Sequence, residues 1–219
     1  MRTYAILPVK RFGEAKQRLD PALDAAARRD LAEAMVGDVL AALREVRELE
    51  GLIVVTGERA GRALAADAGA VTVDDALDAG QSAAATRGIA RAFEAGAERV
   101  LLVPGDCPAL DPAEVAGLVA AGGRPPAVTI VPDRHGTGTN ALLLAPLEVI
   151  APAFGPGSRE RHEDRVREAG AALTVTDLPS LALDVDTGSD LAALRERLDA
   201  IDGGAPRTRA ALAGMLDSP

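Results

Sequence analysis

Aromatic residues and cysteine are scarce in this chain of 219 residues. There is no tryptophan, one tyrosine and three phenylalanines, so the core must be aliphatic, with alanine-rich helices that pack closely. Cys107 is the single cysteine. It excludes an intramolecular disulfide and a zinc site built from several cysteines, and it fits a reducing cytoplasm.

Long apolar runs and basic stretches are also missing. No run approaches the ~20 apolar residues of a membrane-spanning helix, and the one near the N-terminus is too short for a signal peptide. The formal net charge is −9, whereas nucleic acids and anionic membranes both attract a positive surface. No Walker A pattern and no triad signature occurs. We therefore expect a cytoplasmic protein that binds neither nucleic acid nor membrane and is not a P-loop enzyme.

Short aliphatic runs alternate with helical stretches along the chain. The runs are too apolar for a sheet with one solvent-exposed face. Their alternation with helices predicts an α/β fold with a mostly parallel sheet. The pattern breaks at residues 127–146, where two strand-like runs joined by a Gly/Thr loop predict a hairpin or an antiparallel edge strand. We expect one domain over residues 1–202, and a tail over 203–219 that adds a short helix or is loosely held. The expected strands lie within residues 3–9, 49–56, 69–75, 99–105, 127–133, 140–146 and 172–178, and the expected helices within 25–46, 58–69, 82–96 and 111–123.

Three aspartates stand where predicted strands end. Asp184 and Asp186 lie two residues apart in LALDVDTGSDL, so in an extended segment both point the same way. Asp106 leaves the apolar strand of RVLLVPGDCPAL. Ligands of an open parallel sheet bind beyond the carboxyl ends of its strands, where these carboxylates would converge on a hard cation. The alternative is that Asp186 or Thr187 only caps a helix that begins near Ser189.

The densest basic cluster of this acidic protein follows the first predicted strand. Lys10, Arg11, Lys16 and Arg18 all lie in the loop KRFGEAKQRL. A basic loop at the end of a sheet suits phosphate oxygens, although any one of these residues could simply be solvated. Together with three carboxylates, the loop predicts a site for a divalent metal and a polyphosphate.

A Gly/Thr-rich loop offers further candidates in DRHGTGTNALLL. Gly136 and Gly138 have the spacing of a dinucleotide fingerprint, but an apolar strand-like run follows where that motif needs a helix. We interpret the loop instead as a holder of an anionic substrate, through backbone N–H groups and the side chains of Thr137, Thr139 and Asn140.

A second glycine loop precedes a predicted helix in FGPGSRERHEDRV. Ser158, after Gly155 and Gly157, looks like the N-cap of that helix. Such a helix N-terminus suits phosphate or carboxylate, and a plain capped helix is the alternative. His162 falls inside the helix and is expected at the surface, whereas His135 lies in the preceding loop and could touch a ligand.

Taken together, these motifs resemble one family of enzymes. ILPVKRFGEAKQRL, VPGDCPAL, DRHGTGTNALLL, FGPGSRERH and LALDVDTGSDL occur in the order seen in the phospholactate/phosphoenolpyruvate guanylyltransferases, which make the guanylylated precursor of the deazaflavin coenzyme F-420. The resemblance covers about residues 3 to 201. It implies a Rossmann-like nucleotidyltransferase fold with helices on both faces of a mostly parallel, twisted sheet. One departure concerns base recognition, because Gln81 or Ser82 stands where related enzymes often have asparagine.

The resemblance also implies a reaction and its residues. A phosphate oxygen of phosphoenolpyruvate or 2-phospho-L-lactate would attack the α-phosphorus of GTP, and pyrophosphate would leave. The sequence does not choose between these acceptors and 3-phosphoglycerate, and it leaves a homodimer open. The implied roles are Mg²⁺ ligands for Asp106, Asp184 and Asp186, acceptor ligands for Thr139, Gly155 and Ser158, and catalytic residues of the triphosphate-binding loop for Lys10, Lys16 and Arg18.

Two other functions are compatible with parts of the pattern. One is a different nucleotidyltransferase that uses CTP or a sugar phosphate, which the GTGTN and FGPGS loops and the missing Gly-Gly N-terminal signature disfavour. The other is a non-catalytic nucleotide-binding protein, which would have no need to retain three acids and a basic loop.

Overall fold

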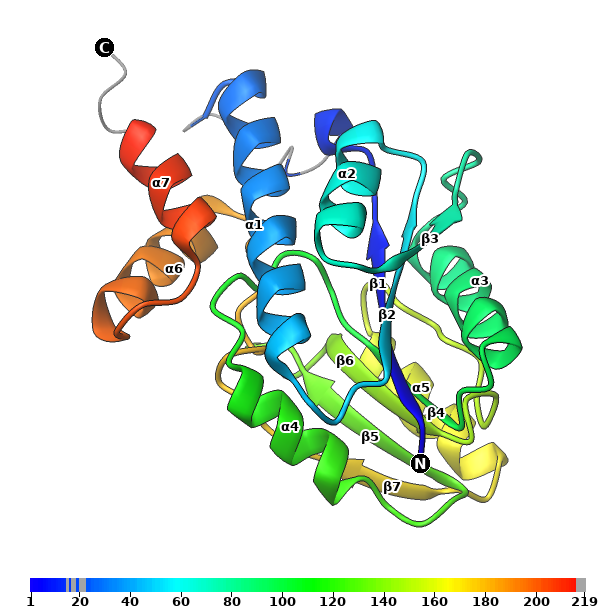
Figure 1. Cartoon of the computed structure of the whole chain (residues 1–219). Helices are drawn as coiled ribbons and strands as arrows, with labels where there is room; N and C mark the ends of the chain where they lie inside the picture. The colour runs from blue at the N-terminus through cyan, green and yellow to red at the C-terminus, as the bar shows by residue number, and fades with distance from the viewer. Residues whose placement is uncertain (15, 17–18, 20–22, 216–219) are drawn as a thin grey trace.

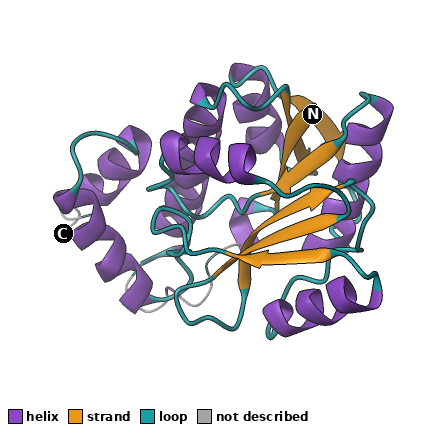
Figure 2. Ribbon diagram, turned by 90° about the horizontal axis from the view of Figure 1, so that it is seen from below, coloured by secondary structure: helices purple, strands orange, loops and turns teal. Residues whose placement is uncertain are grey.

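The computed structural model describes residues 1–14, 16, 19 and 23–215, and these form a sheet with helices on both faces (Figures 1 and 2). The strands are β1 (Thr3–Val9), β2 (Gly51–Thr56), β3 (Val71–Asp74), β4 (Arg99–Leu102), β5 (Ala127–Pro132), β6 (Thr139–Ala145) and β7 (Ala172–Val175). The helices are α1 (Ala25–Glu45), α2 (Arg59–Asp67), α3 (Gln81–Glu94), α4 (Pro112–Ala121), α5 (Ser158–Glu168), α6 (Gly188–Ala200) and α7 (Pro206–Gly214), with a short 3-10 helix η1 (Phe12–Glu14).

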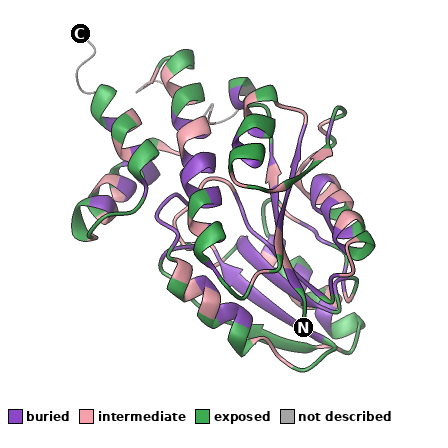
Figure 3. Cartoon of the chain, viewed as in Figure 1, coloured by how far each residue is buried: buried purple, intermediate pink, exposed green. Residues whose placement is uncertain are grey.

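The described strands pair in the order β3-β2-β1-β4-β6-β5-β7. β6 runs antiparallel to both of its neighbours, and the other paired strands are parallel. The predicted hairpin is therefore confirmed as β5–β6, but the alternative of an edge strand is wrong, because β6 lies between β4 and β5. Its position explains its composition, since every residue of β6 is buried whereas the edge strand β7 is exposed (Figure 3).

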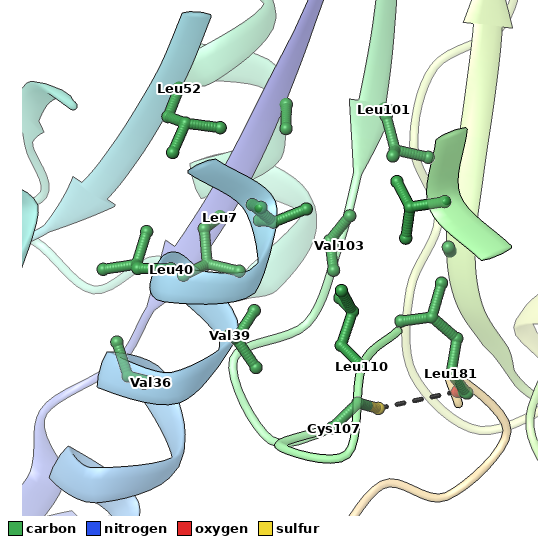
Figure 4. Packing of buried hydrophobic residues seen from close by; sticks show 14 of the residues in the cluster. Leu7, Val36, Val39, Leu40, Leu52, Leu101, Val103, Cys107, Leu110 and Leu181 are labelled. Carbon is green, nitrogen blue, oxygen red and sulfur yellow. Dashed lines mark hydrogen bonds between the residues drawn. The ribbon is translucent and has the colours of Figure 1, made fainter. Parts of the chain in front are cut away.

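Alternate residues of the central strands feed two separate aliphatic layers. Leu7 packs with buried residues of α1, α2 and α4, whereas its neighbour Ile6 packs with α3 and α5. Figure 4 shows the first layer, in which Val36, Val39 and Leu40 of α1 face Leu7. The scarcity of aromatic side chains is thus met by small aliphatic residues packed from both sides.

Cys107 belongs to the same layer and joins two segments that are distant in sequence. Its side chain is fully buried, and Sγ lies 3.5 Å from the carbonyl oxygen of Leu181 (Figure 4). Burial raises the pKa of the thiol, so at neutral pH it is a packed, protonated residue.

The C-terminal helices α6 and α7 form a third cluster against α1. Leu194 and Leu212 are buried there with Leu31 of α1. The carboxylate of Asp38, on α1, accepts hydrogen bonds from the backbone N–H groups of Arg207 and Thr208, at 3.1 and 2.7 Å. α7, within the predicted tail, therefore begins on an acid of another helix, which satisfies donors that its own first turn cannot. None of the helices in the described part of the chain combines the length and the hydropathy of a bilayer-spanning segment.

Candidate active site

The loops singled out in the sequence meet at one cleft of about 620 Å³. It lies beyond the carboxyl ends of β1 and β4. The turn between β5 and β6 lies at the same edge of the sheet, because β6 runs antiparallel to β4. Its wall includes Lys10, Lys16, Gln81, Asp106, His135, Thr139, Gly155, Ser158, Asp184 and Asp186. The topology thus places acids, lysines and glycine loops from five parts of the chain around a single space, as expected for an open α/β sheet.

Lys16 occupies the centre of the acidic side of the cleft. Its ammonium donates hydrogen bonds to Oδ2 of Asp106 at 2.5 Å and to Oδ1 of Asp186 at 3.0 Å. Only 8% of its side chain is exposed. Burial alone would lower the pKa of Lys16, but the charges of the two carboxylates outweigh it and the pKa is raised. The amine is therefore a buried cation between two acids.

Asp184 is held separately. The side-chain amide of Asn140 donates to Oδ1 of Asp184 at 3.2 Å and to the carbonyl oxygen of Leu181 at 2.6 Å. Burial raises the pKa of Asp184, and the charge of Asp106 raises it further. Asn140, expected among the substrate ligands, is thus engaged in orienting an acid.

The acids fit a bound cation on two observations. Oδ1 of Asp106 is buried without a hydrogen-bond partner among the described residues, and the mutual repulsion of Asp106 and Asp184 is part of what raises the pKa of Asp184. Over the same residues no group of three or more Asp, Glu, His or Cys side chains stands ready to hold a metal ion. Instead, the ammonium of Lys16 lies between Asp106 and Asp186.

The segment that carries Asp184 and Asp186 is not the strand that its sequence predicts. Residues 183–186 have no regular secondary structure, and the backbone N–H of Val185 donates to the carbonyl of Asp106 at 3.2 Å. Val185 is fully buried while both acids line the cleft, so the alternation expected of an extended chain is kept without strand pairing. The buried apolar residues produce the strand-like pattern, but the adjacent segment at Asp106 contributes a single backbone hydrogen bond and no strand pairing.

Of the two capping residues that the sequence allows, Asp186 and Thr187, the structure uses Thr187. Thr187 is the N-cap of α6, and it forms a capping box with Asp190. The N–H of Asp186 also donates to Oδ2 of Asp190, at 3.1 Å. The side chain of Asp186 is therefore not required to begin the helix and is left to Lys16 and the cleft.

The two lysines of the basic loop have different surroundings in the cleft. Lys10 is exposed and lines the cleft, as a phosphate ligand would. Lys16 is turned toward Asp106 and Asp186 and has a φ of 60°, in the left-handed region that a lysine rarely adopts. Arg18, the third residue of this loop predicted to be catalytic, lies outside the described residues.

Another part of the cleft wall is formed by the start of β6 and the loop before α5. Thr139 and Ser158 are 7% and 2% exposed, and both line the cleft. Gly155 has a φ of 110°, a backbone conformation that residues other than glycine rarely adopt. The N-cap of α5 is Gly157, in the left-handed region with a φ of 68°, so Ser158 is the first helical residue and not the predicted cap.

His162 was expected at the surface, and that expectation is wrong. It is fully buried, with Nδ1 at 3.0 Å from the hydroxyl oxygen of Thr139 and Nε2 accepting the backbone N–H of Ala153 at 2.8 Å. The signal was present in the sequence, because Ser158, His162 and Val166 repeat every four residues and form the buried face of α5. The many charges of this helix concealed that face.

Comparison with solved structures defines the fold. The chain superposes on a putative nucleotide-diphospho-sugar transferase from Desulfovibrio desulfuricans G20 with a TM-score of 0.66 and 19% identity, over 89% of this chain and 87% of that one. A nucleotidyl transferase from Methanothermobacter gives a TM-score of 0.64 and 22% identity, over 91% and 99%. The fold is thus the Rossmann-like fold of the nucleotidyltransferases.

Sequence comparison narrows the class to a family. Residues 3–197 match the family described as guanylyl transferase CofC like. Proteins named phosphoenolpyruvate guanylyltransferase are 48% identical in Conexibacter woesei, over 99% of this chain and 97% of the relative, and 39% identical in Streptomyces coelicolor, over 99% and 98%. This chain belongs to the CofC-like guanylyltransferase family, and it is a nucleotidyltransferase.

Proposed function

We propose that this protein transfers GMP from GTP to the phosphate of phosphoenolpyruvate, or of the related 2-phospho-L-lactate, and releases pyrophosphate in coenzyme F-420 biosynthesis. The observation that carries the proposal is the cleft itself, which three carboxylates and two lysines line together with Thr139, Gly155 and Ser158. The name shared by the relatives supports phosphoenolpyruvate as the acceptor. These are small molecules, so the proposal requires neither a nucleic acid nor a membrane and is consistent with a cytoplasmic enzyme.

The chemistry requires two anions to be brought together without an enzymic nucleophile. A phosphate oxygen of the acceptor attacks the α-phosphorus of GTP, a new P–O bond forms, and the bond to pyrophosphate breaks. Lys10 lies in the cleft to bind phosphate oxygens, and Lys16 carries a buried positive charge beside it. Fixed positive charge and positioning are the contributions that such a reaction needs from the protein.

Asp106, Asp184 and Asp186 would hold Mg²⁺, which when bound supplies further neutralisation of the phosphate charge. Asn140 orients Asp184 through its amide, and the chain around Val185 is tied to Asp106 by a backbone hydrogen bond. The two parts of this acidic set are therefore linked to each other directly.

A pyrophosphate-release assay tests the proposal. We expect release only when GTP, Mg²⁺ and a phosphorylated three-carbon acid are present together, with phosphoenolpyruvate, 2-phospho-L-lactate and 3-phosphoglycerate compared in parallel. Turnover with CTP in place of GTP would identify a different nucleotidyltransferase. Nucleotide binding without any turnover would identify a non-catalytic binder, and release without an acceptor would contradict the proposed transfer.

Ser158→Ala is expected to weaken the acceptor selectively. The serine lines the wall assigned to the acceptor, and one hydrogen bond to a charged group is worth about 1.5–3 kcal/mol, or roughly 10- to 150-fold in affinity. The Michaelis constants of both substrates should be measured in the same preparation, so that GTP serves as the internal reference. A rise for GTP with no change for the acceptor would place the serine on the wrong substrate.

A further inference from the structure

We propose that His162 is a positioning residue, which fixes the hydroxyl of Thr139 as a hydrogen-bond donor to an anionic group of the acceptor. His162 does not line the cleft and has no exposed surface, so it does not touch a substrate. It acts through Thr139, whose hydroxyl oxygen lies 3.0 Å from Nδ1. The inference rests on the proposed function, because that function assigns Thr139 to the acceptor.

The backbone decides which ring nitrogen carries the proton. The N–H of Ala153 can only donate, and it points at Nε2 over 2.8 Å, so Nε2 must have a free lone pair. In a neutral imidazole the proton is then on Nδ1. Nδ1–H therefore donates to the hydroxyl oxygen of Thr139, and the direction of that hydrogen bond is set by a peptide group on another segment.

The direction matters for what Thr139 can offer the cleft. A hydroxyl has one hydrogen and two lone pairs, and His162 takes up a lone pair. The hydrogen of Thr139 is left to point to another acceptor, and the residue lies at the cleft wall. A hydroxyl held in this way is suited to a carboxylate or phosphate oxygen, both of which only accept.

The surroundings keep the imidazole neutral. Burial, together with the positive charges of Arg165 and Arg161, lowers the pKa of His162 to about 4. A protonated ring would place Nε2–H against the N–H of Ala153, two donors face to face. Phe154 packs edge-on against the ring, with centroids 5.3 Å apart, which fixes its plane.

Arg161, the preceding residue, orders the same loop from the other side. Its guanidinium donates to the carbonyl oxygens of Ala153, Phe154, Gly155 and Pro156. Those carbonyls are therefore turned toward α5 and away from an anion in the cleft. Two consecutive residues of one helix thus set the polarity of the wall, Arg161 through the carbonyls of the loop and His162 through Thr139.

The first test is the variant His162→Phe, which keeps the ring volume and the contact with Phe154 but removes both nitrogens. We expect the Michaelis constant of the acceptor to rise roughly tenfold or more, with that of GTP and the turnover at saturating acceptor near wild type. His162→Gln should restore part of the affinity, because its amide can accept from Ala153 and donate to Thr139. Val166→Ala, on the same buried face, is the matched control for destabilisation of α5 and should leave the acceptor constant unchanged.

Combining His162→Phe with Thr139→Val separates positioning from general packing. If His162 acts through the hydroxyl, the double variant should bind the acceptor no more weakly than Thr139→Val alone. Effects that multiply would overturn the inference, and so would equal losses for GTP and the acceptor in His162→Phe.

A spectroscopic test does not depend on activity. The chain has only two histidines, so nitrogen chemical shifts of labelled imidazole can be assigned with the variant His135→Gln. We expect His162 to be the neutral Nδ1–H tautomer at pH 7 and to remain neutral down to about pH 5. An Nε2–H tautomer or a ring charged at pH 6 would overturn the proposed positioning. If no phospho-acid is turned over, the proposed function fails, and the tautomer alone then decides whether His162 sets the direction of the Thr139 hydroxyl.

Discussion

Asp106→Asn is expected to lower turnover with GTP and the acceptor by roughly a hundredfold or more. The substitution keeps the shape of the side chain but removes the carboxylate charge and the ion pair with Lys16; one oxygen of that carboxylate is buried with no hydrogen-bond partner in the described part of the chain. The rise in melting temperature on adding Mg²⁺ with GTP should shrink as well, because a ligand that binds less tightly stabilises the folded state less. Both quantities can be followed in one preparation, by pyrophosphate release and by melting curves with and without Mg²⁺.

Two further variants show whether the loss is specific to the cleft. Asp186→Asn should behave like Asp106→Asn, since Lys16 pairs with both acids. Asp111→Asn is the matched control, because Asp111 caps α4 and asparagine caps a helix about as well as aspartate. If Asp186→Asn proved as mild as Asp111→Asn, the acids of the cleft would not bind metal, and the metal site would have to lie elsewhere.

Lys16→Met is expected to abolish most of the activity and, at the same time, to strengthen the binding of Mg²⁺ alone. The variant removes a buried positive charge that, in the proposed transfer, would stabilise the phosphates. In the free protein the same charge lies between Asp106 and Asp186, so a cation that binds these acids competes with it. Without the amine the carboxylates repel each other more strongly, which should lower the melting temperature without metal and increase the affinity for Mg²⁺.

Lys10→Met separates the two roles of positive charge in this loop. Lys10 lines the cleft and is exposed, and no hydrogen bond joins it to the acids within the described residues. The variant Lys10→Met should therefore reduce activity and GTP binding, and its affinity for Mg²⁺ alone should equal that of the wild type. A Lys16→Met protein that binds Mg²⁺ as weakly as wild type, or more weakly, would show that the amine does not compete with the metal.

Much of the fold follows from the order of apolar runs, but the place of β6 does not. Its residues TNALLLA indicate a buried strand, and the loop before it predicts a hairpin. Whether that hairpin lies at the edge or within the sheet depends on pairing with β4, which is a contact between distant segments that local pattern does not encode. The edge alternative failed for this reason.

In the site, too, local sequence predicted some features, whereas contacts between distant segments determined others. The three acids and the two glycine loops were recognisable from their residue types and positions, because a strand end or a helix start limits where a side chain can point. Lys16 appeared only as one base of a loop, since its pairing with acids 90 and 170 residues away arises in the folded chain. His162 was misplaced because composition outweighed the four-residue repeat of its buried face.

The reversed strand gives the two walls of the cleft different stiffness. β6 is paired with β5 from Thr139 to Ala145, and its middle residues Leu142–Leu144 are also paired with β4, so Thr139 begins a strand that the sheet holds on both sides. The acids 184–186 stand instead on a stretch outside the sheet, whose backbone is tied by single hydrogen bonds to Asp106 and Asp190 and whose side chains bond to Asn140 and Lys16. Segments held by few bonds adjust at lower free energy than paired strands. Under the proposed function, the acceptor would meet the wall backed by β6, and any rearrangement that admits a charged nucleotide would fall on the acidic segment.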